Sequence, residues 1–316
     1  MGGTSRASVL RSDWRPLGPE RHGLGEGARF LDGRLYFVDI IAGRLLRADP
    51  RSDEPPRELV RLDVPLGAVA LAEPREATGG VPAFIAAAGT GIARLARSGE
   101  LGWFGRPADG GPVERRMNDA ATDPSGRFWA TSMAWDSTDG AGALHRLEPD
   151  GQVTTVLTGC TVPNGPVFSA DGRTMWLADT PRSVILRYDV EPATGDLGGR
   201  EVFVEVDGTP DGMTLDAEGF LWSAIHGSSC LHRYHPSGDL VERIEVPARQ
   251  PTSIAISVGA PHVLVVTSST EGLDEPQDHD GRTLVAEVSV GGRPQPTARA
   301  HQVRPGHGAR RSPRPR

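Results

Sequence analysis

The 316-residue chain combines 40 glycines and 27 prolines with 5% aromatic residues, a bias that suits many tight turns and disfavours long helices. Its formal net charge is −7, and the last thirteen residues, RPGHGARRSPRPR, carry five arginines and no acid, so the remainder has a net charge of −12. An acidic body without a basic stripe excludes a phosphate-tracking surface, and no nucleic-acid partner is expected.

No stretch of the chain has the pattern of a targeting or membrane segment. The N-terminal sequence MGGTSRASVLRSDW has no apolar core of signal-peptide length, and no later apolar run approaches the length of a membrane span. We therefore predict a cytoplasmic protein without a membrane partner. The two cysteines, Cys160 and Cys230, lie far apart in the chain. This separation excludes a paired thiolate metal motif and predicts two reduced, partly buried thiols.

Short apolar strands joined by Gly and Asp turns recur from about residue 24 to residue 290. The first repeat is LGEGARFLDGRLYFVDI followed by the strand LLRADP. The second, at about residues 67–106, is the least regular, and a polar loop at residues 73–80 interrupts it. The third opens with RRMNDAATDPSGRFWATSMAWD and continues with ALHRLEP and QVTTVLT. We predict strands at each apolar run and turns between them.

The second half of the chain continues the same plan. The fourth repeat, VPNGPVFSADGRTMWLADT, has the pattern of a β-hairpin, because apolar positions alternate on both sides of an Asp-Gly turn. The fifth contains TPDGMTLDAEGFLWSAIHG, CLHRYHP and VERIEVP. The sixth contains PTSIAISVGAPHVLVVTSS, a polar loop at residues 271–282 and LVAEVSV. The loops at 73–80 and 271–282 are expected to be the most mobile segments.

The repeats have a regular period, measured at the centre of each second strand. These centres are Tyr36, Phe84, Trp129, Trp176, Trp222 and Leu264, at intervals of 48, 45, 47, 46 and 42 residues. A period near 46 is typical of a four-stranded propeller blade. The sequence therefore predicts an all-β fold, a six-bladed β-propeller.

The six repeats leave the two ends of the chain to be placed. We predict one propeller domain over residues 1–303 and a basic tail over residues 304–316, which is either disordered or contacts an anionic partner. A propeller must be closed, because an open ring leaves two unpaired sheet edges. We expect residues 8–11 to pair in the last blade.

Four polar residues occupy matching positions before the aligned centres. Glu26, Asn118, Asn164 and Asp211 lie 10, 11, 12 and 11 residues before the centres of their repeats. Equivalent positions in successive blades form a ring around the propeller axis. If each first strand is the innermost, these side chains face one another across the mouth of the central channel.

Two interpretations of this polar ring remain open from spacing alone. Two carboxylates and an amide that converge are costly to bury unpaired, which favours a bound cation. Alternatively, the residues cap turns at the start of the inner strands, as Asn and Asp often do. An all-oxygen ligand set suits Ca²⁺, Mg²⁺ or Mn²⁺, although carboxylates also bind Zn²⁺. Three protein ligands would leave coordination positions for water and substrate, as in a catalytic site.

The stretches LGEGARFLDGRLYFVDI, RMNDAATDPSGRFWATSMA, VPNGPVFSADGRTMWLADT and TPDGMTLDAEGFLWSA together carry a family resemblance. They span about residues 23–290, and the chain resembles the family of senescence marker protein (regucalcin), gluconolactonase and luciferin-regenerating enzyme. The resemblance implies a six-bladed propeller with one divalent metal ion in the central channel, with Ca²⁺ as the first expectation. Many members of this family hydrolyse sugar lactones.

Carried over residue by residue, the resemblance implies metal ligands at Glu26, Asn164 and Asp211. The chain departs from the family beside these ligands, because Ala28 and Phe30 stand where Pro and Trp are usual. SMAWD and TSIAISVGA also replace commoner family patterns. These changes affect the expected pocket wall and leave the ligands in place, so the identity of the substrate is what they put in question.

The resemblance also implies how a substrate is bound and attacked. Arg116 and Asn118 match a substrate-binding Arg-x-Asn pair, and Asp136 stands where regucalcin has a substrate-contacting Glu. Asp211 matches the proposed general base. We therefore expect a divalent-metal-dependent hydrolase that opens a small sugar-derived lactone. The alternative is a non-catalytic, regucalcin-like propeller that binds a metal or a small molecule.

Other side chains are weaker candidates. His226 follows the second strand of the fifth repeat, and a place at the channel rim and a surface or turn position both remain open. Trp103, Met133 and Trp135 either line a sugar-stacking wall or pack in the blade cores. No Gly-x-Ser-x-Gly motif and no ordered Ser-His-Asp set is present, so serine hydrolysis has no support.

Overall fold

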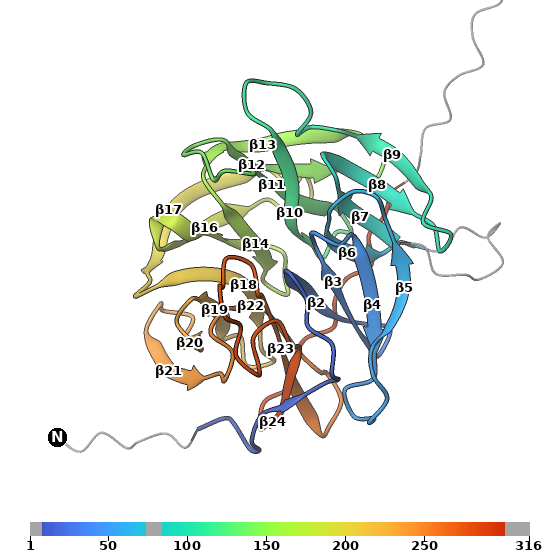
Figure 1. Cartoon of the computed structure of the whole chain (residues 1–316). Helices are drawn as coiled ribbons and strands as arrows, with labels where there is room; N and C mark the ends of the chain where they lie inside the picture. Colours follow the sequence, from blue (N-terminus) through green and yellow to red (C-terminus); the bar gives the residue numbers. More distant parts are fainter. Residues whose placement is uncertain (1–7, 74–83, 301–316) are drawn as a thin grey trace, which may run out of the picture.

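Six four-stranded antiparallel sheets form the blades of the computed structural model, arranged around one central axis (Figure 1). The structure describes residues 8–73 and 84–300. Within these two ranges, one short 3₁₀ helix, η1 (Thr180–Arg182), accompanies the strands. The prediction of an all-β, six-bladed propeller is confirmed.

The first three blades follow the predicted repeats. Blade one consists of β2 (Gly25–Leu31), β3 (Arg34–Asp39), β4 (Arg44–Ala48) and β5 (Arg57–Arg61). Blade two consists of β6 (Leu66–Leu71), β7 (Phe84–Ala88), β8 (Gly91–Leu95) and β9 (Leu101–Gly105). Blade three consists of β10 (Arg115–Thr122), β11 (Phe128–Ala134), β12 (Gly142–Leu147) and β13 (Val153–Cys160).

The second three blades complete the ring. Blade four consists of β14 (Pro163–Phe168), β15 (Thr174–Asp179), β16 (Val184–Val190) and β17 (Leu197–Glu205). Blade five consists of β18 (Thr209–Leu215), β19 (Leu221–His226), β20 (Cys230–Tyr234) and β21 (Leu240–Glu245). Blade six consists of β22 (Pro251–Ile256), β23 (His262–Ser268), β24 (Leu284–Val288) and the N-terminal β1 (Arg15–Pro16).

The residues that set the sequence period lie in the second strand of every blade, and all six are buried. Buried carboxylates hold the indole rings of two of these residues, Trp129 and Trp222, in place. Asp123 accepts a hydrogen bond from Trp129 Nε1 at 3.0 Å, and Asp216 accepts one from Trp222 Nε1 at 2.9 Å. In these two blades the tryptophan at the centre of the repeat therefore links its strand to the turn that precedes it.

The first strand of each blade is innermost, as expected, and the first strands of neighbouring blades pack side by side around the axis. The first strands, such as β2, are almost wholly buried, whereas outer strands such as β17 are mostly exposed. Side chains at the start and at the end of the inner strands therefore meet at opposite ends of the axis. We call these two ends the site face and the far face.

The N-terminal segment closes the ring. Leu10 bridges to Val288, and Arg11 N–H donates to the Glu287 carbonyl at 2.8 Å. The expected pairing of residues 8–11 in the last blade is confirmed, and the regular outer strand β1 follows at Arg15–Pro16, paired with β24. Sheet hydrogen bonds thus join the two ends of the propeller sequence and leave no open ring edge there.

The C-terminal segment after β24 crosses the far face of the propeller. Gly292 bridges to Asp216 in blade five, and Ala298 bridges to Ala72 in blade two. We call residues 291–299 the C-terminal strap. The basic tail at 304–316 and most of the polar loop at 73–80 lie outside the described residues.

Two further expectations concern membranes and cysteines. Within the described ranges, no helix of the structure is long and apolar enough to cross a membrane. Cytoplasmic location stays a prediction. Cys160 and Cys230 are both free and buried, which confirms the predicted pair of separate thiols.

Candidate active site

A β-bulge interrupts each inner strand that carries a predicted ring residue. The register shifts lie between Glu26 and Arg29, Met117 and Ala120, Asn164 and Val167, and Pro210 and Met213. A bulge breaks the regular alternation of side chains and re-aims the residues beside it. The four polar residues are therefore able to face the axis from strands that are otherwise packed against apolar neighbours.

The glycines after the ring residues have local structural roles. Gly165 has φ +88°, a backbone conformation that side chains rarely adopt. A Cβ at Gly212 would lie 2.8 Å from both the Cα of Ser253 and the carbonyl of Thr252 in the neighbouring inner strand. The small residues thus allow the bulges to form and the blades to approach each other closely.

A chain of hydrogen bonds joins three of the predicted site residues. Arg116 Nη1 donates to Asn118 Oδ1 at 2.7 Å, and Asn118 Nδ2 donates to Asn164 Oδ1 at 2.9 Å. Asn164 Nδ2 donates in turn to Thr180 Oγ1 at 2.9 Å. Because both amides are oriented by their partners, the carbonyl oxygen of Asn164 keeps one acceptor position for a further group.

Glu26 and Asp211 lie buried within electrostatic range of each other. Burial and the nearby Asp119 raise the pKa of Glu26 to about 8. Burial, Glu26 and Asp119 raise the pKa of Asp211 well above its usual range. Each carboxylate therefore disfavours ionisation of the others, and a cation placed among them would relieve both the repulsion and the cost of burial.

The donor set fits a hard divalent cation. Glu26 and Asp211 supply carboxylate oxygens and Asn164 supplies an amide oxygen, the donor types that Ca²⁺, Mg²⁺ and Mn²⁺ prefer. Among the described residues, no group of three or more His, Cys, Asp or Glu side chains is placed to hold an ion. A metal site here would therefore need oxygen donors besides these side-chain types, and the amide oxygen of Asn164 is the predicted one.

Asp119 and Arg29 are two site residues that the repeat alignment did not single out. Asp119 is 2% exposed and accepts hydrogen bonds from Ala120 N–H at 2.7 Å, Gly165 N–H at 3.0 Å and Arg29 Nη2 at 3.1 Å. It therefore joins inner strands of blades one, three and four. The signal for Asp119 was a second polar residue directly after Asn118, followed by the small residues Ala120 and Ala121.

Arg116 lies between the polar ring and an exposed aromatic side chain. Its guanidinium carbon is 5.4 Å from the ring centroid of Trp135, which is 46% exposed. Its Nε is buried and has no hydrogen-bond partner within the described residues. Burial lowers the pKa of Arg116, and the charge of Glu271 acts in the opposite direction. This arginine thus keeps a free donor at the site face.

The three candidates for a sugar-stacking wall lie in different places in the structure. Trp135 lies against Arg116, at the site, and Met133 is buried opposite Arg116 in the β10–β11 ladder. Trp103 lies in the outer strand β9, where it packs against an apolar cluster and Arg106 covers its ring at 4.4 Å. Trp103 therefore belongs to blade packing, and Trp135 is the exposed aromatic residue beside Arg116.

The structure places Asp136 in the turn after β11, one residue beyond Trp135. Its carboxylate is exposed and accepts hydrogen bonds from the N–H and the hydroxyl of Thr138 at 3.0 and 2.6 Å, which lower its pKa. Among the described residues, no hydrogen bond or ion pair joins Asp136 to Arg116 or Asn118. Its role in substrate binding stays a prediction. His226, at the end of β19, is partly buried, and burial lowers its pKa.

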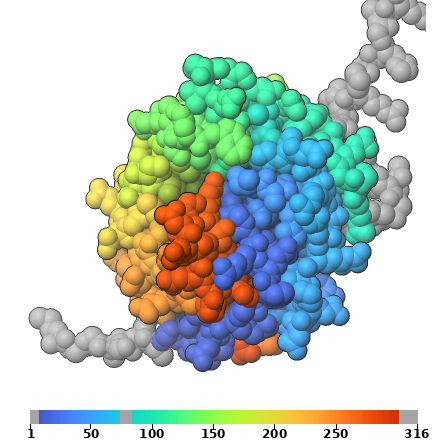
Figure 2. Space-filling view, viewed as in Figure 1, coloured from blue at the N-terminus to red at the C-terminus, as the bar shows by residue number. Residues whose placement is uncertain are grey.

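The loop after β23 begins beside the first blade. Leu24 bridges to Ser269, and the N–H groups of Thr270 and Glu271 donate to the Gly23 carbonyl at 3.0 and 3.1 Å. Figure 2 shows the orange segment that contains this loop next to the blue first blade, on the side turned to the viewer. Because Glu271 acts on the charge of Arg116, this loop borders the site face.

The fold and the site define a six-bladed β-propeller with a buried, oxygen-rich polar centre at one end of its axis. The family model described as SMP-30/gluconolactonase/LRE-like region matches residues 24–270, and the chain belongs to this family. The resemblance seen in the sequence is confirmed.

Individual relatives agree with this assignment. The chain is 34% identical to pentonolactonase XacC of Haloferax volcanii over 298 residues, which cover 86% of this chain and 93% of the relative. It is 34% identical to 6-deoxy-6-sulfogluconolactonase of Pseudomonas putida over 242 residues, covering 75% and 79% of the two chains. The crystal structure of a calcium-binding protein, regucalcin, of Agrobacterium tumefaciens matches with a TM-score of 0.82 and 28% identity, covering 93% of this chain and 99% of that one.

Proposed function

We propose that this protein is a divalent-metal-dependent hydrolase that opens a sugar-derived lactone. The observation that carries the proposal is the junction of two groups on the site face. One is the oxygen set of Glu26, Asn164 and Asp211, and the other is the Arg116–Asn118 pair, joined to it by the 2.9 Å hydrogen bond between Asn118 and Asn164. The relatives named pentonolactonase and 6-deoxy-6-sulfogluconolactonase support lactone hydrolase activity.

Glu26, Asn164 and Asp211 would hold the cation. When bound, a divalent ion supplies Lewis-acid polarisation of the lactone carbonyl. The calcium-binding name of the regucalcin relative favours Ca²⁺, and Mg²⁺, Mn²⁺ and Zn²⁺ are the alternatives to compare with it. Burial is the main cause of the raised pKa values of Glu26 and Asp211, and the repulsion between neighbouring carboxylates adds to it.

Asp211 is the proposed general base. Its ionised carboxylate takes a proton from a water molecule as the water oxygen bonds to the lactone carbonyl carbon. The ring C–O bond then breaks, and the proton passes to the departing ring oxygen to give a hydroxy acid. Burial raises the pKa of Asp211, and the negative charges of Glu26 and Asp119 raise it further, whereas a bound cation would favour the ionised form that acts as the base.

Arg116 and Asn118 would orient the lactone. The 2.7 Å hydrogen bond between them fixes the guanidinium, and the unpartnered Nε of Arg116 leaves a donor for a substrate oxygen. The exposed ring of Trp135 beside Arg116 offers an apolar surface to a sugar ring. Substrate is thus held by one charged donor, one oriented amide and one aromatic face, all beside the proposed base.

Replacing Arg116 with alanine should lower kcat/KM for the lactone by roughly 10- to 150-fold, because a charge-assisted hydrogen bond is lost. Metal affinity should stay nearly unchanged, since an arginine does not coordinate a cation. Steady-state kinetics and metal titration measure the two effects. Arg187→Ala, which removes an arginine paired with Glu201 on an outer strand, is the control. An Arg116→Ala protein that loses its metal or unfolds, without a specific kinetic defect, would assign Arg116 a structural role.

A panel of sugar lactones tests the proposed function as a whole. Acid release should be measured with purified protein, first with added divalent ion and then with chelator. We expect rapid opening of at least one pentono- or hexonolactone that stops with chelator and returns when metal is restored. Metal binding without turnover of any lactone in the panel would support the non-catalytic, metal-binding alternative.

A further inference from the structure

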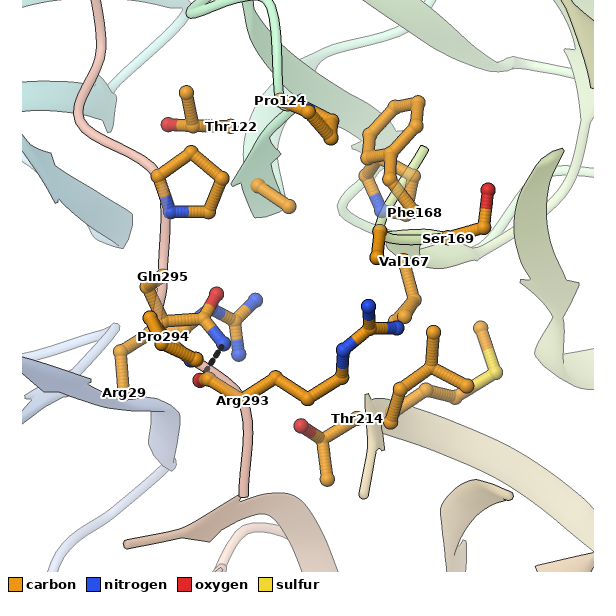
Figure 3. Close-up of a pocket in the computed structure, with 16 residues that line it drawn as sticks. Arg29, Thr122, Pro124, Val167, Phe168, Ser169, Thr214, Arg293, Pro294 and Gln295 are labelled. Carbon is orange, nitrogen blue, oxygen red and sulfur yellow. Dashed lines mark hydrogen bonds between the residues drawn. The ribbon is translucent and has the colours of Figure 1, made fainter. Parts of the chain in front are cut away.

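A pocket lies on the far face, at the opposite end of the axis from the candidate active site (Figure 3). Its volume is about 270 Å³, and its lining includes the last residues of three inner strands, Thr122, Phe168 and Leu215. The ring residues of the same strands stand four positions earlier. At about 3.3 Å per residue, this places the pocket roughly 10–13 Å from the polar ring.

The C-terminal strap forms one wall of this pocket. Residues 293–296, Arg-Pro-Gln-Pro, line it between the anchoring bridges at Gly292 and Ala298. Gly292 N–H also donates to the Ser257 carbonyl at 2.9 Å, and Ala298 N–H donates to the Leu71 carbonyl at 2.7 Å. Because the strap is attached on both sides, the wall is part of the folded propeller.

Two arginines give the pocket its charge. Arg29 Nη2 donates to Asp119 Oδ1 at 3.1 Å and to the Ala120 carbonyl at 2.8 Å, so its charge is already compensated. The guanidinium of Arg293 has no ion pair or hydrogen bond within residues 8–73 and 84–300. Figure 3 shows the Arg293 side chain extended across the pocket toward Val167. Among the described lining residues there is no carboxylate.

The wall that faces Arg293 is largely apolar. Val167, Phe168, Met213 and Leu215 contribute side chains from β14 and β18, and Thr214 adds a hydroxyl. An uncompensated guanidinium opposite an apolar wall suits a molecule with an anionic group at one end and an apolar body at the other. At about 30 Å³ for each water-sized unit, the volume accommodates roughly nine non-hydrogen atoms.

We propose that the far-face pocket binds a small organic carboxylate with an apolar body. Arg293 receives the carboxylate, and the side chains of Val167, Phe168 and Met213 cover the apolar part. Arg29 borders this pocket and bonds to Asp119, but none of the proposed metal ligands or substrate-binding residues lines the pocket. This proposal therefore stands or falls independently of lactone hydrolysis.

Benzoate and its neutral analogue benzamide, which have nearly the same shape, test the charge requirement. Isothermal titration of the full-length, metal-loaded protein should show that benzoate binds and that benzamide binds at least about 10-fold more weakly. Arg293→Gln should weaken benzoate binding by about 10-fold or more, whereas the control Arg187→Gln, on β16, the third strand of blade four, should leave it unchanged. Thr214→Phe, which fills the pocket, should also abolish binding.

Arg116→Ala distinguishes this pocket from the site face. Benzoate affinity that survives Arg116→Ala and is lost in Arg293→Gln supports the far-face pocket. Loss in Arg116→Ala with retention in Arg293→Gln overturns it and places benzoate at the candidate active site. Equal binding of benzoate and benzamide, or no binding of benzoate to the unmodified protein, also overturns it. Wild-type melting temperatures for Arg293→Gln and Thr214→Phe ensure that lost binding reports the pocket and not the fold.

Discussion

Asp211→Asn should reduce lactone hydrolysis by at least about 10²–10⁴-fold, the usual contribution of one general base. The neutral amide does not accept the proton of the attacking water, and it is also a weaker ligand for a divalent cation than a carboxylate. Asp211 is 8% exposed and lies within the field of Glu26 and Asp119. The initial rate of acid release, measured at saturating divalent ion, gives the size of the effect.

Metal content, measured on the same samples, separates the two causes. A variant that keeps one bound ion but loses turnover assigns Asp211 to proton transfer, and a variant that loses the ion assigns it to metal binding. Asp171→Asn is the matched control, because Asp171 is an exposed turn residue that accepts from Ser169 and Arg173. Wild-type turnover by Asp211→Asn would show that this residue is neither base nor essential ligand.

Metal-free protein should lose stability as the pH rises from about 5 to 8, and saturating divalent ion should cancel that loss. In the folded protein the pKa of Glu26 is raised to about 8, from the value of 4.5 that an unperturbed glutamate has. A carboxyl group with a raised folded pKa contributes stability that is present below its unfolded pKa and is lost as the pH passes through the folded value. This pKa shift corresponds to a decrease in the free energy of unfolding on the order of 3–5 kcal/mol over that pH range. Thermal melts at several pH values, with chelator and with metal, measure it.

The expected fall in melting temperature is about 5–15 °C across this pH range. In metal-free Glu26→Gln the fall should be much smaller, because the neutral amide removes the group that must ionise. The same variant should gain little from added metal. Glu205→Gln, on the outer strand β17, serves as the control and should behave as wild type. An identical pH dependence in Glu26→Gln and the unmodified protein would remove Glu26 from the explanation.

The fold could be predicted from the sequence because a propeller blade is local in the chain. In five of the six blades, four consecutive strands pair with their nearest neighbours in order. The Asp-Gly turns and the apolar centres, such as Trp176 and Trp222, therefore mark each blade without knowledge of the others. The ring of Glu26, Asn118, Asn164 and Asp211 follows from the same period, since equal spacing puts equivalent residues at the same height of successive inner strands.

The contacts between blades were decided by the tertiary structure. Arg29 and Asp119 pair across 90 residues, between blades one and three. They stand 7 and 10 residues before the centres of their repeats, so the alignment of repeats does not match them. Asp136 matches a family position, but in the structure its carboxylate accepts from Thr138 in its own turn. Neither the partner of a buried arginine nor the direction of an exposed carboxylate follows from spacing, because both depend on which backbone groups come near in space.

On the far face, too, some features follow from the sequence and others only from the tertiary structure. The sequence by itself determined six blades and a polar ring, because repeated local patterns encode repeated local pairing. The route of residues 291–299 across the end of the axis has no repeat to mark it. The uncompensated charge of Arg293 depends on that route, and so does the pocket that it borders. Such features arise where non-repeating segments cover a repeating framework, and their energies come from long-range packing, which the period does not record.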